Sequence, residues 1–257
     1  MLIKTQAIVL RNMKLGDSSM IVDLLTESEG MLSFVIRIPK TSKAKIRKQF
    51  FQPLTVLDIE FDYRPRASLQ HISEARIALP FVSIPFSPEK LAASDVYKRQ
   101  SLFIAEFLLY ATRGEQGNSR LFSYLVGGIA WLDAATGSFA NFHLVFMMRL
   151  TLFLGFYPNL DDYRNGMFFD LRNACFTSFM PAHSDVLQPV EAARVITLMR
   201  MGFESIHLFR MNRTDRNRIA EIILHYYRLH VPQMPELKSF EVLKEMGVPL
   251  APGGGMA

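Results

Sequence analysis

The sequence predicts an α+β protein in which an N-terminal five-stranded OB-fold β-barrel is followed by an all-α helical-bundle domain. Two observations support this prediction. Five short apolar runs separated by turn residues occupy the first 80 residues, and helical spacing begins after a proline-rich stretch at 80–88. With 257 residues, of which 49% are hydrophobic and 21% charged, the chain can bury two modest cores. We therefore expect a nucleic-acid-binding type of barrel at 1–80, a helical domain at 81–248 and a loose tail at 249–257.

The barrel prediction depends on runs rich in Ile, Val, Leu and Phe. The expected strands are Thr5–Arg11, Ser19–Leu25, Met31–Arg37, Leu54–Tyr63 and Leu69–Leu79. The fourth run alternates between apolar and acidic residues, as in Leu57-Asp58-Ile59, which is the period of a half-buried strand. Five short strands suit a small closed barrel, and the OB-fold is the five-stranded barrel of this kind.

The helical prediction depends on apolar residues that recur at spacings of three and four. The expected helices are Ser101–Arg113, Ser119–Asp133, Phe139–Leu154, Val190–Met201, Thr214–His230 and Pro235–Met246. The third is apolar almost all round and should lie inside the bundle, ending at Gly155 and Pro158. The fifth has Asn212 or Thr214 as its N-cap. We expect 159–189 to be irregular.

Composition narrows the class of protein. The single cysteine, Cys175, excludes an internal disulfide and suits a reducing compartment. The first residues lack the apolar segment of a secretory signal. No apolar stretch reaches the roughly 18 residues that a membrane span needs. We therefore expect a cytoplasmic protein without a membrane partner.

A basic cluster is the most informative feature. Six cations lie within twelve residues between the third and fourth expected strands, and no Asp or Glu falls between Gly30 and Leu57. The cluster consists of Arg37, Lys40, Lys43, Lys45, Arg47 and Lys48. On the rim of an OB barrel such cations bind nucleic acid by releasing counterions, without reading sequence. The alternative is a solvated basic loop. Phe50 and Phe51, which follow, either stack on bases or fill the barrel core.

A second basic stretch opens the helix expected at Thr214. It consists of Arg210, Arg213, Arg216 and Arg218. Cations are disfavoured near a helix N-terminus, so this stretch is either a solvated face or a site for a phosphate or an acidic partner.

Motifs for catalysis are absent from the sequence. It has no G-x-x-x-x-G-K-[ST] loop, no G-x-S-x-G elbow and no H-E-x-x-H helix. Cys175 carries no nucleophile signature. We expect a protein that is not an enzyme and takes no cofactor or small-molecule substrate. Two rivals stay open: an OB-fold RNA-binding or translation-associated module, and an enzyme with a diffuse site.

One segment looks foreign to the chain. Asp95–Gln100 reads DVYKRQ, which a transposon-end adapter used in preparing DNA libraries can encode. We interpret Ser94–Gln100 as a sequencing scar and leave it out of functional reasoning. The alternative is an ordinary basic helix N-terminus.

Several stretches resemble the RecO family of recombination mediators. They are KTQAIVLR (Lys4–Arg11), LGDSSMIVDLLT (Leu15–Thr26), GMLSFV (Gly30–Val35), QPLTVLDIE (Gln52–Glu60), LFLGFYPNL (Leu152–Leu160) and YYRLHVPQMPELKSFEVL (Tyr226–Leu243). The resemblance implies an ATP-independent bacterial protein, cytoplasmic and nucleoid-associated, that binds single- and double-stranded DNA and anneals complementary strands. With RecR, such proteins load recombinase onto DNA covered by single-strand-binding protein.

The resemblance also implies where partners bind. The DNA-contacting loop maps onto Lys40–Lys48, and RecR docks on the N-terminal domain. The acidic C-terminal tail of single-strand-binding protein docks on the helical domain, where Arg149 is our candidate; alternatively, Arg149 caps the edge of the bundle. Many members carry a four-cysteine zinc site, whereas here only Cys175 remains in Asn159–Pro189. His183, Asp170 and Asp185 are the other available ligand types, but without paired C-x-x-C spacing we predict no zinc.

Overall fold

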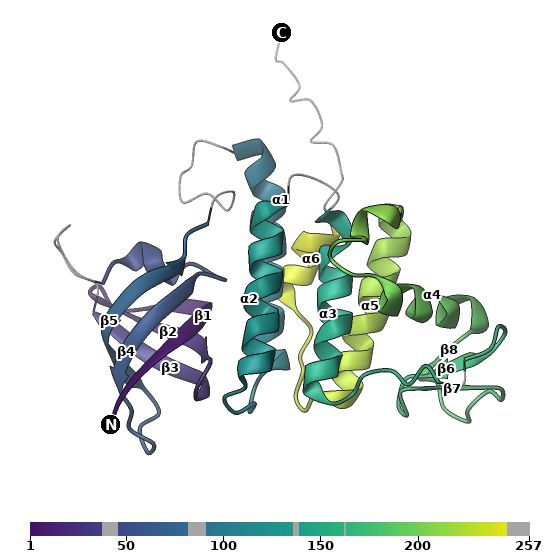
Figure 1. Cartoon of the computed structure of the whole chain (residues 1–257), viewed down its shortest axis with the longest axis horizontal. Coiled ribbons are helices and arrows are strands. Elements are labelled where there is room, and N and C mark those ends of the chain that lie inside the picture. The colour runs from purple at the N-terminus through teal and green to yellow at the C-terminus, as the bar shows by residue number, and fades with distance from the viewer. Residues whose placement is uncertain (38–45, 82–90, 136–138, 162, 246–257) are drawn as a thin grey trace, which may run out of the picture.

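A computed structural model describes residues 1–37, 46–81, 91–135, 139–161 and 163–245, without the side chains of 91–97. A β-barrel lies beside a bundle of six α-helices (Figure 1). The barrel strands are β1 (Leu2–Leu15), β2 (Ser19–Thr26), β3 (Gly30–Arg37), β4 (Val56–Asp62) and β5 (Gln70–Leu79). They close in the order β1-β2-β3-β5-β4, and only β3 and β5 pair in parallel. The predicted α+β fold, an OB barrel followed by helices, is confirmed.

The first strand is longer than the expected Thr5–Arg11. Its 14 residues pair with β4 from Leu2 to Ile8 and with β2 from Ala7 to Leu15. The register shifts between Val9 and Arg11, where an extra residue bends the strand. A strand shared by two neighbours has to bend in this way to close the barrel.

Aromatic side chains fill the barrel. Phe34, Phe51 and Phe61 are fully buried, and the rings of Phe34 and Phe61 meet edge to face at 5.1 Å. Phe51 belongs to the 3-10 helix η1 (Lys48–Phe51) between β3 and β4, and Phe50 is half-buried against the same core. Phe51 is therefore a core residue, and the alternative that it stacks on bases is wrong.

The helices form the second layer of the molecule. Their bounds are α1 (Leu91–Ala111), α2 (Ser119–Ala134), α3 (Phe142–Leu154), α4 (Pro189–Arg200), α5 (Arg213–His230) and α6 (Lys238–Lys244). Nine of the thirteen residues of α3 are buried, which confirms its expected place inside the bundle. Gly155 ends α3 with a φ of +84°, a conformation that favours glycine. Asn212 caps α5, with its Oδ1 accepting from the backbone N–H of Asp215.

The segment expected to be irregular contains a small sheet. Strands β6 (Phe168–Asp170), β7 (Cys175–Thr177) and β8 (Val186–Leu187) pair antiparallel in the order β7-β6-β8. Strands of two or three residues are too short to show a period of two, so the sequence pattern missed them.

The barrel has an apolar core of its own and packs on the bundle through a second apolar cluster. Ile8, Leu25 and Val56 of the barrel belong to the same buried cluster as the helices. The β2–β3 turn also meets the loop between α1 and α2. A Cβ on Gly117 would lie 1.9 Å from the carbonyl oxygen of Ser28, and one on Gly30 would lie 2.1 Å from that of Glu115. Only glycine permits this backbone approach. The expected boundary at residue 80 falls between β5 and α1.

The suspected foreign segment lies within α1. Gln100 is fully buried and its Nε2 donates to the carbonyl of Phe139 at 3.0 Å. Its Oε1 and the neighbouring Ser101 Oγ are buried without a hydrogen-bond partner. The interpretation of Ser94–Gln100 as a scar stays a prediction. No described helix combines the length and apolarity that crossing a membrane requires.

Candidate nucleic-acid interface

The outer face of β1, β2 and β3 carries a continuous row of apolar side chains. The pairing aligns Met13 with Ile21, Ile21 with Val35, and Val35 with His71 of β5. Side chains alternate along a strand, and the neighbours of this row, Val22 and Phe34, are fully buried. The row therefore points away from the barrel core. This face of the second and third strands is where OB-folds bind oligonucleotides.

A depression of about 480 Å³ lies at the end of this row, where β3 and β5 meet. It is lined by Ser19, Val35, Ile36, Arg37, Ile46, His71 and Ile72. Arg37 and His71 are exposed at its edge, whereas Ile36 is buried. Among the described residues of the lining, Arg37 carries the one permanent charge, which is positive.

The basic cluster adjoins this depression. Arg37 ends β3, and Arg47 and Lys48 lie at the start of η1, so described cations flank both ends of 38–46. All three are exposed. None of these three forms an ion pair with a carboxylate of the described chain, so their charge is available to a ligand. Lys40, Lys43 and Lys45 lie outside the described residues.

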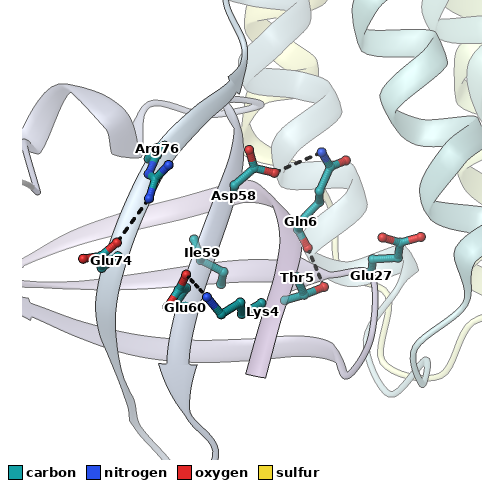
Figure 2. A pocket seen from close by; sticks show the side chains of 9 residues that line it. All are labelled: Lys4, Thr5, Gln6, Glu27, Asp58, Ile59, Glu60, Glu74 and Arg76. Atoms are coloured by element: carbon teal, nitrogen blue, oxygen red, sulfur yellow. Dashed lines mark hydrogen bonds and ion pairs between the residues drawn. The ribbon is translucent and has the colours of Figure 1, made fainter. Parts of the chain in front are cut away.

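The β1–β4–β5 side of the barrel has the opposite charge. A depression of about 420 Å³ there contains four carboxylates and two cations (Figure 2). Lys4 binds Glu60 at 2.6 Å, and Arg76 binds Glu74 at 3.4 Å. The two remaining acids, Glu27 and Asp58, leave this side net negative. A polyanion is therefore attracted to the β3 rim and repelled here.

Comparison with known proteins identifies the family of this chain. The family model described as "Recombination protein O N terminal" matches residues 1–81, and "Recombination protein O C terminal" matches 101–239. The chain belongs to the RecO family of DNA repair proteins. It is 52% identical over 247 residues to a DNA repair protein RecO of Bacteroides fragilis, covering 96% of this chain and 99% of the relative. A RecO of Phocaeicola vulgatus is 47% identical over 246 residues, with the same coverage.

In this RecO-family chain, Arg149 belongs to α3 and its side chain reaches the segment after α4. Its Nε donates to the carbonyl of Met201 at 3.0 Å. It has no carboxylate partner among the described residues, and Leu152, one turn further along α3, is 59% exposed. Burial raises the pKa of the neighbouring Tyr124, and the charge of Arg149 opposes this effect. Arg149 thus combines an unneutralised cation with an exposed apolar neighbour.

The second basic stretch is engaged within the protein. The Nε of Arg213 donates to the carbonyl of Lys244 at 2.7 Å, and Arg218 binds Glu191 at 2.8 Å. Arg216 is half-buried, and this burial is the main reason that its pKa is lowered. The stretch therefore stabilises contacts of α5 rather than forming a converging site.

The candidate metal ligands do not fit zinc. Asp170 accepts from the backbone N–H groups of Arg172 and Asn173 and from the side-chain amide of Asn173 at 2.7 Å. Asp185 binds Arg172 at 2.6 Å and His225 at 2.7 Å. In the described part of the chain, no three His, Cys, Asp or Glu side chains converge as metal ligands do. The carboxylates that would be ligands already have partners, so these residues are unsuited to a zinc ion.

Cys175 is not an activated thiol. Burial raises its pKa, and the nearby Asp170 raises it further.

The sequence did not reveal that His71 and Val35 lie together on the barrel face, because alternation along each strand does not show that β3 and β5 are neighbours.

Proposed function

We propose that this chain is a non-catalytic mediator of DNA repair that binds single- and double-stranded DNA and anneals complementary strands. One observation carries the proposal: exposed, unpaired cations border an outward apolar row on the strand face with which OB-folds bind oligonucleotides. Such a surface holds the phosphate backbone without reading sequence. It would therefore accept either of two complementary strands.

A strand-annealing assay tests the proposal. Two complementary oligonucleotides are mixed with the protein at increasing salt and without nucleotide. We expect accelerated annealing that weakens steeply with salt, because phosphate contacts release counterions. A requirement for ATP would contradict the proposal. Preference for structured RNA would instead favour the alternative of an RNA-binding or translation-associated module.

We infer further that the protein helps to load recombinase on DNA covered by single-strand-binding protein, with RecR docked on the barrel domain. The acidic tail of single-strand-binding protein would dock at Arg149, which has a free cationic face beside exposed Leu152. Arg149→Ala should abolish binding of a peptide that ends in acidic residues and Phe. Arg164→Ala, which removes an exposed cation elsewhere, is the control. Equal binding by both variants would exclude this site.

The same proposal places the protein in the bacterial cytoplasm at the nucleoid. A fluorescent fusion expressed at its native level should overlap with DNA stain, and should gather into foci after DNA damage. Uniform fluorescence that never overlaps with DNA would contradict this placement.

A further inference from the structure

We propose that the depression between β3 and β5 receives one unpaired nucleobase of single-stranded DNA, which stacks on His71 while the adjoining phosphate meets Arg37. This inference rests on the proposed DNA-binding function and adds to it a site that distinguishes single strands from duplex. The depression is that lined by Ser19, Val35, Ile36, Arg37, Ile46, His71 and Ile72.

The geometry of the strands creates this site. β3 and β5 pair at two positions only, Phe34 with Gln70 and Val35 with His71. Beyond them β3 continues to Arg37 beside β2, whereas β5 continues beside β4. The diverging strands leave a hollow whose floor is the buried Ile36. Its volume of about 480 Å³ lies within the range of roughly 300–1,000 Å³ that is usual for small-molecule pockets.

The backbone that carries His71 is held in position by the neighbouring Gln70. Gln70 is 2% exposed, and its Oε1 accepts from the backbone N–H of Arg64 at 2.9 Å. Its Nε2 donates to the carbonyls of Arg64 and Ala67 at 2.9 and 3.0 Å. The start of β5 is therefore anchored to the β4–β5 loop. Because the backbone is fixed, only the side-chain torsions of His71 have to be ordered when its exposed imidazole stacks on a ligand.

The lining matches the chemistry of a base. Val35, Ile46 and Ile72 are half-buried aliphatic side chains that suit the apolar faces of an aromatic ring. The half-buried hydroxyl of Ser19 is available to the polar edge of the base. None of the described residues that line the hollow is a carboxylate, so these residues bring no charge that would repel the attached phosphate.

Among its described residues, the face has no exposed Phe, Tyr or Trp ring of the kind on which OB-folds usually stack bases. Phe34, Phe51 and Phe61 are all buried in the barrel core. In this part of the described chain, stacking falls to the ring of His71. A base within a duplex has both faces covered by its neighbours, so only an unpaired base can enter. The site therefore favours single strands, whereas the cationic rim accepts both forms.

Three ligands of equal length test the inference on the full-length protein. They are oligothymidylate of about 20 nucleotides, an abasic strand with the same number of phosphates, and the corresponding duplex. We expect the parent protein to bind oligothymidylate about fivefold or more tighter than the abasic strand. His71→Ala should remove this difference, leaving affinity for the abasic strand and the duplex unchanged. His71→Phe should restore the difference, because it keeps a stacking ring.

His207→Ala is the matched control, because it removes an exposed histidine from the 3-10 helix η3 (Ile206–Leu208) in the other domain. It should leave all three affinities unchanged. Thermal unfolding of each variant checks that the barrel is folded, and 2-aminopurine fluorescence in a single strand reports stacking directly.

Equal affinity of the parent for oligothymidylate and the abasic strand would overturn the inference while leaving DNA binding intact. A His71→Ala variant that loses affinity for all three ligands alike would overturn it too, since His71 would then contact phosphate. If the parent bound none of the three at low salt, the proposed function would fail, and the inference with it.

Discussion

Neutralising the described cations of the β3 rim should change how DNA binding responds to salt. The variant replaces Arg37, Arg47 and Lys48 with Gln, which removes three positive charges but keeps much of each side chain. All three side chains are exposed and free of ion pairs with described carboxylates. Their loss should therefore remove phosphate contacts without breaking contacts inside the barrel.

The magnitude follows from counterion release. Each phosphate contact with a single strand contributes about 0.7 to the slope of log affinity against log salt. If all six cations of the cluster contact phosphates, affinity should fall roughly 300-fold between about 50 and 200 mM salt. With three contacts removed, the slope drops by about 2 and the same salt change should cost only about 20-fold.

Fluorescence anisotropy of a labelled oligonucleotide over this salt range measures both slopes. The control variant replaces Arg164, Arg228 and Lys238, three exposed cations of the helical domain, with Gln. Both variants lower the formal charge from +5 to +2 (5 − 3 = 2), so a pure net-charge effect would act on them equally. Equal slopes for the two variants would refute a role for the rim. The loss of affinity should be the same for every base sequence tested.

Four further predictions concern the fold and the chain itself. Gly117→Ala should lower the free energy of unfolding, measured by urea denaturation, by at least about 2 kcal/mol, because its Cβ would lie 1.9 Å from the Ser28 carbonyl oxygen. Gly127→Ala, which has open space on α2, should raise it by up to about 1 kcal/mol. Similar values for the two variants would contradict the close backbone approach at Gly117. Burial lowers the pKa of His143 to about 3, so the unfolded chain takes up its proton first as pH falls. Unfolding free energy should then drop by about 1.4 kcal/mol per pH unit between about 6 and 3, a slope that His143→Leu should reduce; equal slopes would disprove this linkage. Elemental analysis of the purified protein should find no bound zinc, and one tightly held equivalent would overturn the assignment of Asp170 and Asp185 to purely polar contacts. Resequencing of the chromosomal gene should show that it encodes other residues at Ser94–Gln100. An unchanged sequence would exclude a sequencing scar.

The barrel could be predicted because its strands are separated by strong turn signals and one of them alternates cleanly. The full length of β1 could not, since its first half pairs with β4, more than fifty residues away along the chain. The sheet of β6, β7 and β8 was missed for a different reason. Its strands are too short to show a period, and it packs through the buried Phe169, Phe176 and Leu187 on helices distant in the sequence.

The candidate site was predictable only in part. The basic cluster that begins at Arg37 could be identified from the sequence, because its cations are dense and no Asp or Glu lies among them. Which face of the barrel receives a ligand depends on the parallel pairing of β3 with β5, which brings Val35 next to His71. Because β4 lies between β3 and β5 in the sequence, no local sequence pattern predicts that these two strands pair. For the second basic stretch the sequence left two interpretations open, and the structure shows Arg213 and Arg218 in contacts within the protein.

The strand pairings that close the barrel differ in length. The β3–β5 pairing has two residue pairs, against six to eight at each of the other four pairings. This is the line along which thermal fluctuation opens the cylinder most readily, so amide hydrogens of 34–37 and 70–72 should exchange with deuterium early. An oligonucleotide bound across the β3–β5 pairing would hold these two strands together. Binding of DNA would then slow exchange at the backbone amides of these two segments.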